Sequence, residues 1–165
     1  SQEPFLFNAS IRDNICYGSD NIDTNSIERA AKRSQAWEFI EKLPLGYDTI
    51  LGENGVKISG GQAQRIAIAR ALILNPSILI IDDGASALDA KTEKLIQDAI
   101  KDILKTRTTL ITTHRLAIIA EADKILILDK GQLVGFGSHE ELIHNNDYYR
   151  NLFEEHYELP EIVRR

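Results

Sequence analysis

The chain has 165 residues, a formal net charge of −6 at pH 7 and 43% hydrophobic residues. This length and composition suit one α/β domain, and the negative charge argues against a nucleic-acid-binding surface. No apolar run reaches the roughly 18 residues of a membrane span. The longest candidate, residues 67–81, is interrupted by Arg70, Asn75 and Pro76. A single cysteine, Cys16, excludes an internal disulfide and suits a reducing compartment.

The N-terminal part of the chain predicts a connector followed by two helices. Residues 1–7 form the connector, and their apolar side chains need a surface to cover them, which a partner could supply. Residues 8–17 predict a short helix that ends before Gly18. Residues 24–43 carry apolar side chains at helical spacing, and Asp23 is suited to cap a helix that spans them.

The sequence ISGGQ at residues 58–62 predicts the start of another helix. Ser59 and Gln62 have the spacing of a capping box, in which each side chain satisfies a backbone N–H group. Gly60 and Gly61 each cost about 1 kcal/mol relative to alanine within a helix. Glycines let another group approach the backbone, and a helix N-terminus favours an anion, so we interpret this turn as a phosphate-binding site.

A strand with two terminal carboxylates follows that helix. Residues 78–81 are an unbroken apolar run, which predicts a strand buried on both faces of a parallel sheet. Asp82 and Asp83 come directly after it, where open α/β sheets bind ligands. These side chains could hold a hydrated cation and orient a water molecule. The alternative is a pair of solvated aspartates with no ligand.

The remainder of the chain alternates helices and strands, as in a parallel α/β sheet. The expected elements are a helix over residues 91–105, a strand over 108–112, a short helix over 115–122, a hairpin of strands over 124–128 and 132–136, and one terminal helix. Ser138 and Glu141 have the spacing of a second capping box, which starts the terminal helix.

The order of these motifs resembles the nucleotide-binding domain of ATP-binding cassette (ABC) transporters, especially of the exporter type. The matches are residues 58–62 to the signature motif, with Ile58 where Leu is usual, residues 78–82 to the Walker B strand, residues 86–89 to the D-loop, His114 to the switch histidine and Gln2 to the Q-loop glutamine. The resemblance implies a P-loop NTPase type of parallel α/β sheet with a helical subdomain that carries the signature motif.

The phosphate-binding sequence GxxxxGK followed by Ser or Thr is absent from the 165 residues. In the resembled family it precedes the Q-loop, so we interpret the chain as the C-terminal part of a longer polypeptide. Residues 1–75 would hold the Q-loop, the helical subdomain and the signature helix, and residues 76–165 the C-terminal part of the ATPase core. We expect the isolated chain to bind ATP poorly and to be inactive.

The resemblance implies an ATPase that uses ATP and Mg²⁺ to power export. Two such domains pair head to tail at the cytoplasmic face of a membrane, where transmembrane domains contact them, and no nucleic acid is involved. One ATP site would receive Gln2, Asp82, Asp83 and His114, with Asp82 and Gln2 at the metal. The other site would receive Ser59, Gly60, Gly61 and Gln62, with Asp89 at the interface between them.

Asp83 departs from the family pattern, which has Glu after the Walker B aspartate. The shorter side chain should fall roughly 1 Å short of the attacking water, which can cost about a hundredfold in rate. We therefore expect a heterodimeric exporter with a degenerate site at Asp83. The alternatives are a regulatory clamp that binds nucleotide without hydrolysis and an ABC ATPase with no role in transport. His114 could also be a satisfied core residue.

Overall fold

The computed structural model describes residues 4–19, 21–52, 55–82 and 89–154. Contacts divide the chain into two units, Ser1–Thr112 and Thr113–Arg165. None of the helices in the described ranges has the length and hydropathy needed to cross a membrane.

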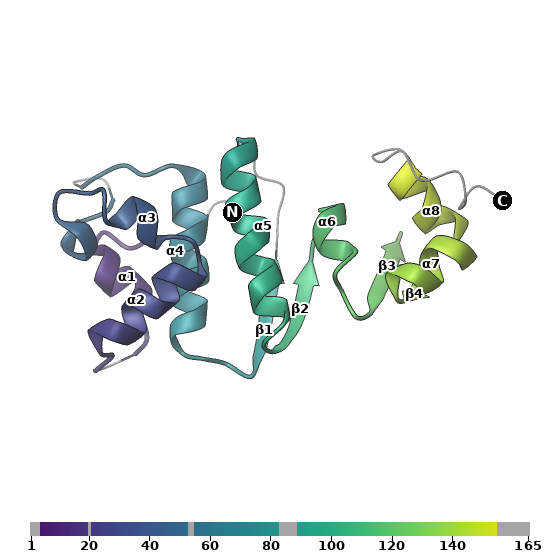
Figure 1. Cartoon of the computed structure of the whole chain (residues 1–165), viewed down its shortest axis with the longest axis horizontal. Coiled ribbons are helices and arrows are strands. Elements are labelled where there is room, and N and C mark those ends of the chain that lie inside the picture. Colours follow the sequence, from purple (N-terminus) through teal and green to yellow (C-terminus); the bar gives the residue numbers. More distant parts are fainter. Residues whose placement is uncertain (1–3, 20, 53–54, 83–88, 155–165) are drawn as a thin grey trace. The chain divides into compact units, whose positions relative to one another are not determined.

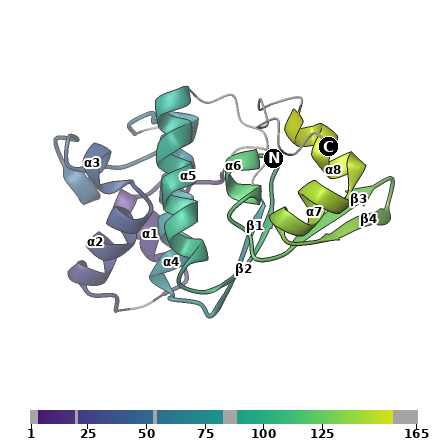
Figure 2. The ribbon, with the colours of Figure 1, turned by 45° about the vertical axis from the view of Figure 1, so that its right-hand side comes forward.

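The first unit is organised around one long helix, α4. Its elements are α1 (Ile11–Cys16), α2 (Thr24–Arg33), α3 (Trp37–Ile40), the 3-10 helix η1 (Gly46–Asp48), α4 (Gly60–Ile73), β1 (Ile78–Asp82), α5 (Ala90–Leu104) and β2 (Thr108–Thr112). α4 contacts α1, α2 and α5, and α5 lies beside the strands (Figures 1 and 2). The core between the helices contains fully buried isoleucines, among them Ile11, Ile15 and Ile66.

The second unit is a hairpin with short helices. Its elements are α6 (Leu116–Ile119), β3 (Ile125–Asp129), β4 (Gln132–Gly137), α7 (His139–Asn145) and α8 (Asp147–Glu154). The β3 and β4 strands pair antiparallel, as the sequence predicts. Lys130 and Gly131 join them with φ values of 48° and 78°, the left-handed pair that a tight hairpin turn needs. Apolar side chains of the hairpin and of α7 and α8 form its core.

Several sequence predictions are confirmed by these elements. Both capping boxes are present, at Ser59 with Gln62 and at Ser138 with Glu141. Asp23 caps α2 through the N–H of Ser26. The β1 and β2 strands pair parallel with α5 between them in the chain, which is the expected α/β alternation.

The prediction of one helix over residues 24–43 is wrong. The helix breaks after Arg33, because Gln35 takes a left-handed conformation with φ of 59°. A remote contact stabilises the break, since Arg65 Nη1 donates to the Gln35 carbonyl at 2.8 Å. The terminal helix is also divided, with Asn146 in an extended conformation between α7 and α8.

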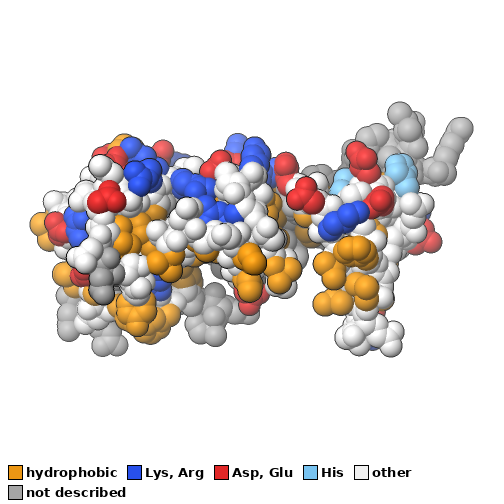
Figure 3. Space-filling view, turned by 90° about the horizontal axis from the view of Figure 1, so that it is seen from below, with side chains coloured by type: hydrophobic (Ala, Val, Ile, Leu, Met, Phe, Trp, Pro, Cys, Tyr) orange, Lys and Arg blue, Asp and Glu red, His pale blue; other side chains and the backbone are white. Residues whose placement is uncertain are grey.

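The prediction that β1 is buried on both faces is also wrong for the described residues. Leu79 is buried, but Ile78 and Ile80 are 65% and 71% exposed. Their neighbour on β2, Leu110, is exposed as well. The reason is that the described part of this sheet has two strands and is covered by α5 on one side. Figure 3 shows that apolar side chains gather on the surface of each unit.

Candidate functional site

The N-terminus of α4 has an open backbone donor. Ser59 Oγ accepts from the N–H of Gln62 at 3.3 Å, and Gln62 Oε1 accepts from the N–H of Ser59 at 2.9 Å. The N–H of Ala63 donates to the Ser59 carbonyl. Within the described part of the chain, the N–H groups of Gly60 and Gly61 have no acceptor, but Gly61 is buried, so the donor that this turn presents at the surface is the N–H of the exposed Gly60, together with a partial positive charge.

Gly60 is not required by the packing of its own unit. A Cβ atom built at this residue meets no heavy atom within 4 Å among the described residues, and Gly60 is exposed. A glycine in a helix costs free energy relative to alanine, and here no internal contact explains it. The space in front of the turn is therefore available to a group from outside the unit.

Arg65 fixes the position of this turn. Its side chain is buried, Nε donates to the Gly61 carbonyl at 3.2 Å, and its guanidinium lies 5.0 Å from the centroid of the Phe39 ring. Burial lowers the pKa of Arg65 from its ordinary value, although an arginine stays charged in proteins. Together with its bond to Gln35, this contact fastens the first turn of α4 to the break between α2 and α3.

The strand ends carry the predicted acidic and basic side chains. Asp82 is exposed at the carboxyl end of β1 and is the register partner of Thr112 on β2. His114 comes two residues after β2, at the start of the second unit, and is also exposed. Asp83 and Gln2 lie outside the described residues.

Asp89 has a local structural role. Its side chain accepts from the N–H of Thr92 at 3.0 Å and caps α5. Hydrogen bonds from Thr92 lower the pKa of Asp89, which keeps the cap ionised. The spacing of Asp and Thr before an apolar helix is a capping signal that the sequence analysis did not use.

Two other residues were missed by the sequence analysis, Asn14 on α1 and Arg70 on α4. Asn14 is fully buried, and Arg70 donates to its backbone and side chain. Each of them is a polar residue at a position where the helical spacing of apolar residues predicts a buried side chain. That pattern could have identified both.

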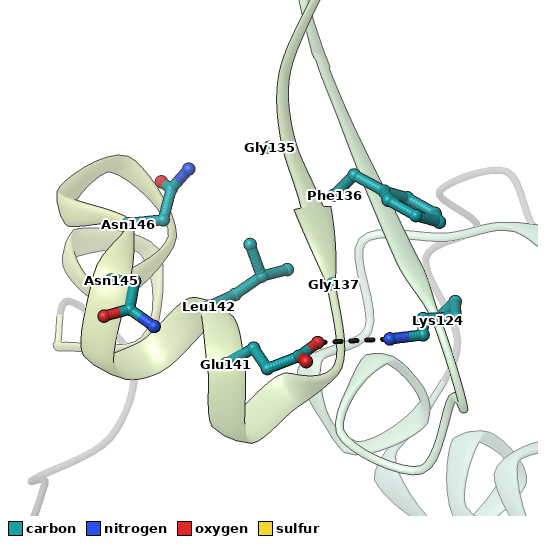
Figure 4. A pocket seen from close by; sticks show the side chains of 8 residues that line it. All are labelled: Lys124, Gly135, Phe136, Gly137, Glu141, Leu142, Asn145 and Asn146. Atoms are coloured by element: carbon teal, nitrogen blue, oxygen red, sulfur yellow. Dashed lines mark hydrogen bonds and ion pairs between the residues drawn. The ribbon is translucent and has the colours of Figure 1, made fainter.

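The second unit contains an open depression of about 490 Å³ between β4 and α7, lined in part by Lys124, Gly137 and Glu141 (Figure 4). Lys124 Nζ and Glu141 Oε2 form an ion pair at 3.1 Å, so their charges offset each other. The same Glu141 oxygen accepts from the N–H of Ser138 at 2.7 Å. These groups are occupied with one another, and the depression is best explained by packing of the hairpin against α7.

Comparisons with known proteins agree with the motifs. The family model described as ABC transporter matches residues 1–86. The chain is 51% identical over 156 residues to the ABC transporter ATP-binding protein YknU of Bacillus subtilis, covering 94% of this chain and 27% of that protein. It is 49% identical over 154 residues to the ATP-dependent lipid A-core flippase of Alcanivorax borkumensis, covering 93% of this chain and 26% of the flippase.

A solved structure of a bacterial Atm1-family ABC exporter with ATP bound is similar to this fold. The TM-score is 0.82 at 43% identity, and the match covers 94% of this chain and 27% of the exporter chain. The chain thus spans about a quarter of the length of these relatives. The predicted fold class, an α/β fold of the P-loop NTPase type, is confirmed by this likeness. The chain belongs to the ABC transporter family.

Proposed function

We propose that this chain is part of an ATP-binding and ATP-hydrolysing module that powers transport by an ABC exporter. The observation that carries the proposal is the start of α4, where the exposed Gly60 offers an N–H group without an acceptor among the described residues and packing does not require a glycine. A phosphate suits that donor and the helix charge. The family membership and the ATP-bound exporter of similar fold support the same ligand.

Two different ATP sites use the residues of this chain. The first turn of α4, Ser59 to Gln62, binds the terminal phosphate of an ATP held by a second nucleotide-binding domain in a head-to-tail pair. Its open N–H group faces charge that develops on the phosphate oxygens. Asp89 lies at the interface of the pair while it caps α5.

The second site uses the strand ends. Asp82 and Gln2 would hold Mg²⁺, and the exposed carboxylate of Asp82 at a strand end is a fitting oxygen ligand for a hydrated cation. When bound, the metal offsets phosphate charge. Asp83 would orient the attacking water, and the exposed His114 would donate a hydrogen bond to the phosphate.

The organisation of the chain follows from these roles. Residues 1–75 form the Q-loop, helical subdomain and signature helix, and residues 76–165 form the C-terminal part of the ATPase core. The partners are a second nucleotide-binding domain and transmembrane domains, at the cytoplasmic face of a membrane. Exporter relatives support these partners.

Asp83 makes the second site a slow one. Its side chain is one methylene shorter than that of glutamate, so the carboxylate would be expected to fall short of the attacking water. We infer that the parent transporter is a heterodimer in which ATP stays bound at this degenerate site while the other site hydrolyses. The same residue favours the second candidate, a regulatory clamp that binds nucleotide without hydrolysis.

An experiment on the complete parent polypeptide, combined with its partner, separates these functions. Retention of Mg-ATP tests the binding role, and release of phosphate at the site containing Asp83 tests hydrolysis. Asp83→Glu should raise that single-site rate by up to about a hundredfold. A complex that never retains Mg-ATP contradicts the whole proposal. Retention without phosphate release in either variant identifies the clamp.

A further inference from the structure

The side chain of Arg65 reaches back along α4 and holds two backbone carbonyls from different parts of the first unit. Its Nε donates to the Gly61 carbonyl at 3.2 Å, and its Nη1 donates to the Gln35 carbonyl at 2.8 Å. The guanidinium also lies 5.0 Å from the centroid of the Phe39 ring. Arg65 is 6% exposed, so one buried cation joins the first turn of α4 to the residues on both sides of the α2–α3 break.

The end of α2 has a conformation that its sequence does not favour. The N–H of Ala36 donates to the Ala31 carbonyl at 2.8 Å and the N–H of Gln35 to the Lys32 carbonyl at 3.0 Å, which is the pattern of a Schellman motif. The left-handed residue of this motif is usually glycine, but here it is Gln35, with φ of 59°. A glutamine is less stable than glycine in this conformation, and the bond from Arg65 to its carbonyl helps to hold it there.

The first turn of α4 also benefits from a restraint, because it opens with two glycines. Glycine adopts many backbone conformations, and helix ends fray. The capping box fixes the residues on either side of the pair, and the bond from Arg65 fixes the Gly61 carbonyl. A fixed Gly61 limits the orientations of the exposed Gly60 that precedes it. A donor that is held in place beforehand loses less freedom when it binds a ligand.

We propose that Arg65 is a positioning residue for the anion site at the start of α4, which it holds in the orientation that receives a phosphate. The inference rests on the proposed function, since that function places a phosphate at this turn. The guanidinium suits the task because it donates to two carbonyls in fixed directions while it stacks on a ring. A lysine has the charge but not the fork, so Arg65→Lys separates positioning from simple attraction between charges.

The first test measures hydrogen exchange in the complete polypeptide without nucleotide. In Arg65→Lys, the amides of residues 34–36 and 62–63 should exchange at least about tenfold faster, whereas those of residues 67–73 should keep their protection. Equal exchange of the two segments in both proteins overturns the positioning contact. Loss of protection over residues 67–73 also overturns the inference, because it would show that Arg65 supports the whole helix.

The second test measures the protection from exchange that Mg-ATP gives to residues 60–63 in the parent complex with its partner. Arg65→Lys should raise the Mg-ATP concentration for half-maximal protection at least about fivefold, because the turn is no longer preorganised. An unchanged concentration would show that charge is sufficient and would overturn the inference. A complex of unaltered sequence in which Mg-ATP never protects residues 60–63 overturns the proposed function instead, and the exchange without nucleotide still decides the contact.

Phe39 allows the same contact to be tested without a change on α4. Phe39→Leu removes the ring beneath the guanidinium but keeps an apolar side chain. It should raise the half-maximal Mg-ATP concentration about twofold and add little to Arg65→Lys, because both changes act on one contact. Fully additive shifts would show that the two residues act independently, and they would overturn the inference.

Arg70 offers a matched control on the same helix. It donates to the Asn14 carbonyl at 2.7 Å and to the Phe5 carbonyl at 2.9 Å, and its guanidinium lies 5.3 Å from the centroid of the Phe7 ring. It lies ten residues beyond Gly60, a rise of about 15 Å along the helix. Arg70→Lys should leave the half-maximal Mg-ATP concentration for residues 60–63 unchanged. A shift equal to that of Arg65→Lys would contradict a specific role for Arg65.

Discussion

The helices α4 and α7 begin with the same capping box, but the two helix starts differ in charge and in what their glycines contact. The α4 box pairs Ser59 with the neutral Gln62, whereas the α7 box pairs Ser138 with Glu141. Two glutamates stand in the first turn of α7, and the first turn of α4 contains no acidic residue. The positive end of α7 thus has its anions within the chain, while that of α4 is open to one from outside.

The glycines beside the two boxes differ in the same way. A Cβ atom at Gly137 would lie 3.0 Å from Glu141 Oε2 and 3.3 Å from Glu141 Cβ, so a larger residue there would fit only if Glu141 shifted. A Cβ atom at Gly60 would meet nothing within 4 Å. A capping box alone is therefore a structural device. Two further features indicate a ligand. The first turn has no acidic residue, and it has a glycine that packing does not explain.

The largest effect should come from placing an acid at the open helix start. Gly60→Glu puts a negative charge in the first turn of α4, where it favours the helix by a few tenths of a kcal/mol but repels a phosphate. Retention of Mg-ATP by the parent complex should fall at least about tenfold, with no loss of thermal stability. Gly60→Gln is the uncharged control. Equal retention in the glutamate and wild-type proteins would mean that no anion binds at this turn.

A smaller effect should separate the two glycines. Gly137→Ala should destabilise the second unit by about 1 kcal/mol or more, because the new methyl group presses on Glu141. Gly60→Ala should leave the stability of the first unit unchanged or raise it by about 0.5–1 kcal/mol. Hydrogen exchange of α7 and α4 amides measures both changes. The comparison breaks if the two substitutions change local stability in the same direction and by the same amount.

The smallest effect concerns pH. The N–H of Ser138 and the Lys124 ammonium hold the pKa of Glu141 below its ordinary value. A carboxyl group whose pKa is lower in the folded than in the unfolded protein stabilises the fold at pH values above its pKa in the unfolded protein. This stabilisation is lost as the pH falls through its pKa in the folded protein. Protection of α7 amides should therefore decrease between about pH 5 and pH 3, and Glu141→Gln should remove most of this dependence. The neutral cap of α4 should show no such loss.

Local patterns made the helix starts and the alternation of elements predictable. The capping boxes at Ser59 and Ser138 depend on residues three apart, so sequence spacing is sufficient to find them. The break at Gln35 could not be found in this way, because its carbonyl accepts from Arg65, thirty residues later. Asn14 and Arg70 are likewise joined over 56 residues. Their roles depend on tertiary packing, which no short window of sequence contains.

The candidate site was predictable in its motifs and less so in its geometry. Gly60 and Gly61 are identified by their cost in a helix, and the structure adds that Gly60 is exposed and not required by packing, whereas Gly61 is buried. The cap that Asp89 forms on α5 is predictable from the spacing of Asp89 and Thr92. Its expected place at the interface of two domains comes only from resemblance to the family. For β1, the apolar run indicates a buried strand without indicating how many of its faces are covered.

The bare face of the parallel pair, formed by Ile78, Ile80 and Leu110, gives the isolated chain a characteristic response to temperature. Water in contact with such side chains contributes a large heat capacity, which is removed when the side chains are covered. Any association of the isolated chain through this face should therefore strengthen on mild warming and weaken in the cold. Sulfate should favour the associated form at every temperature, because it is excluded from protein surfaces.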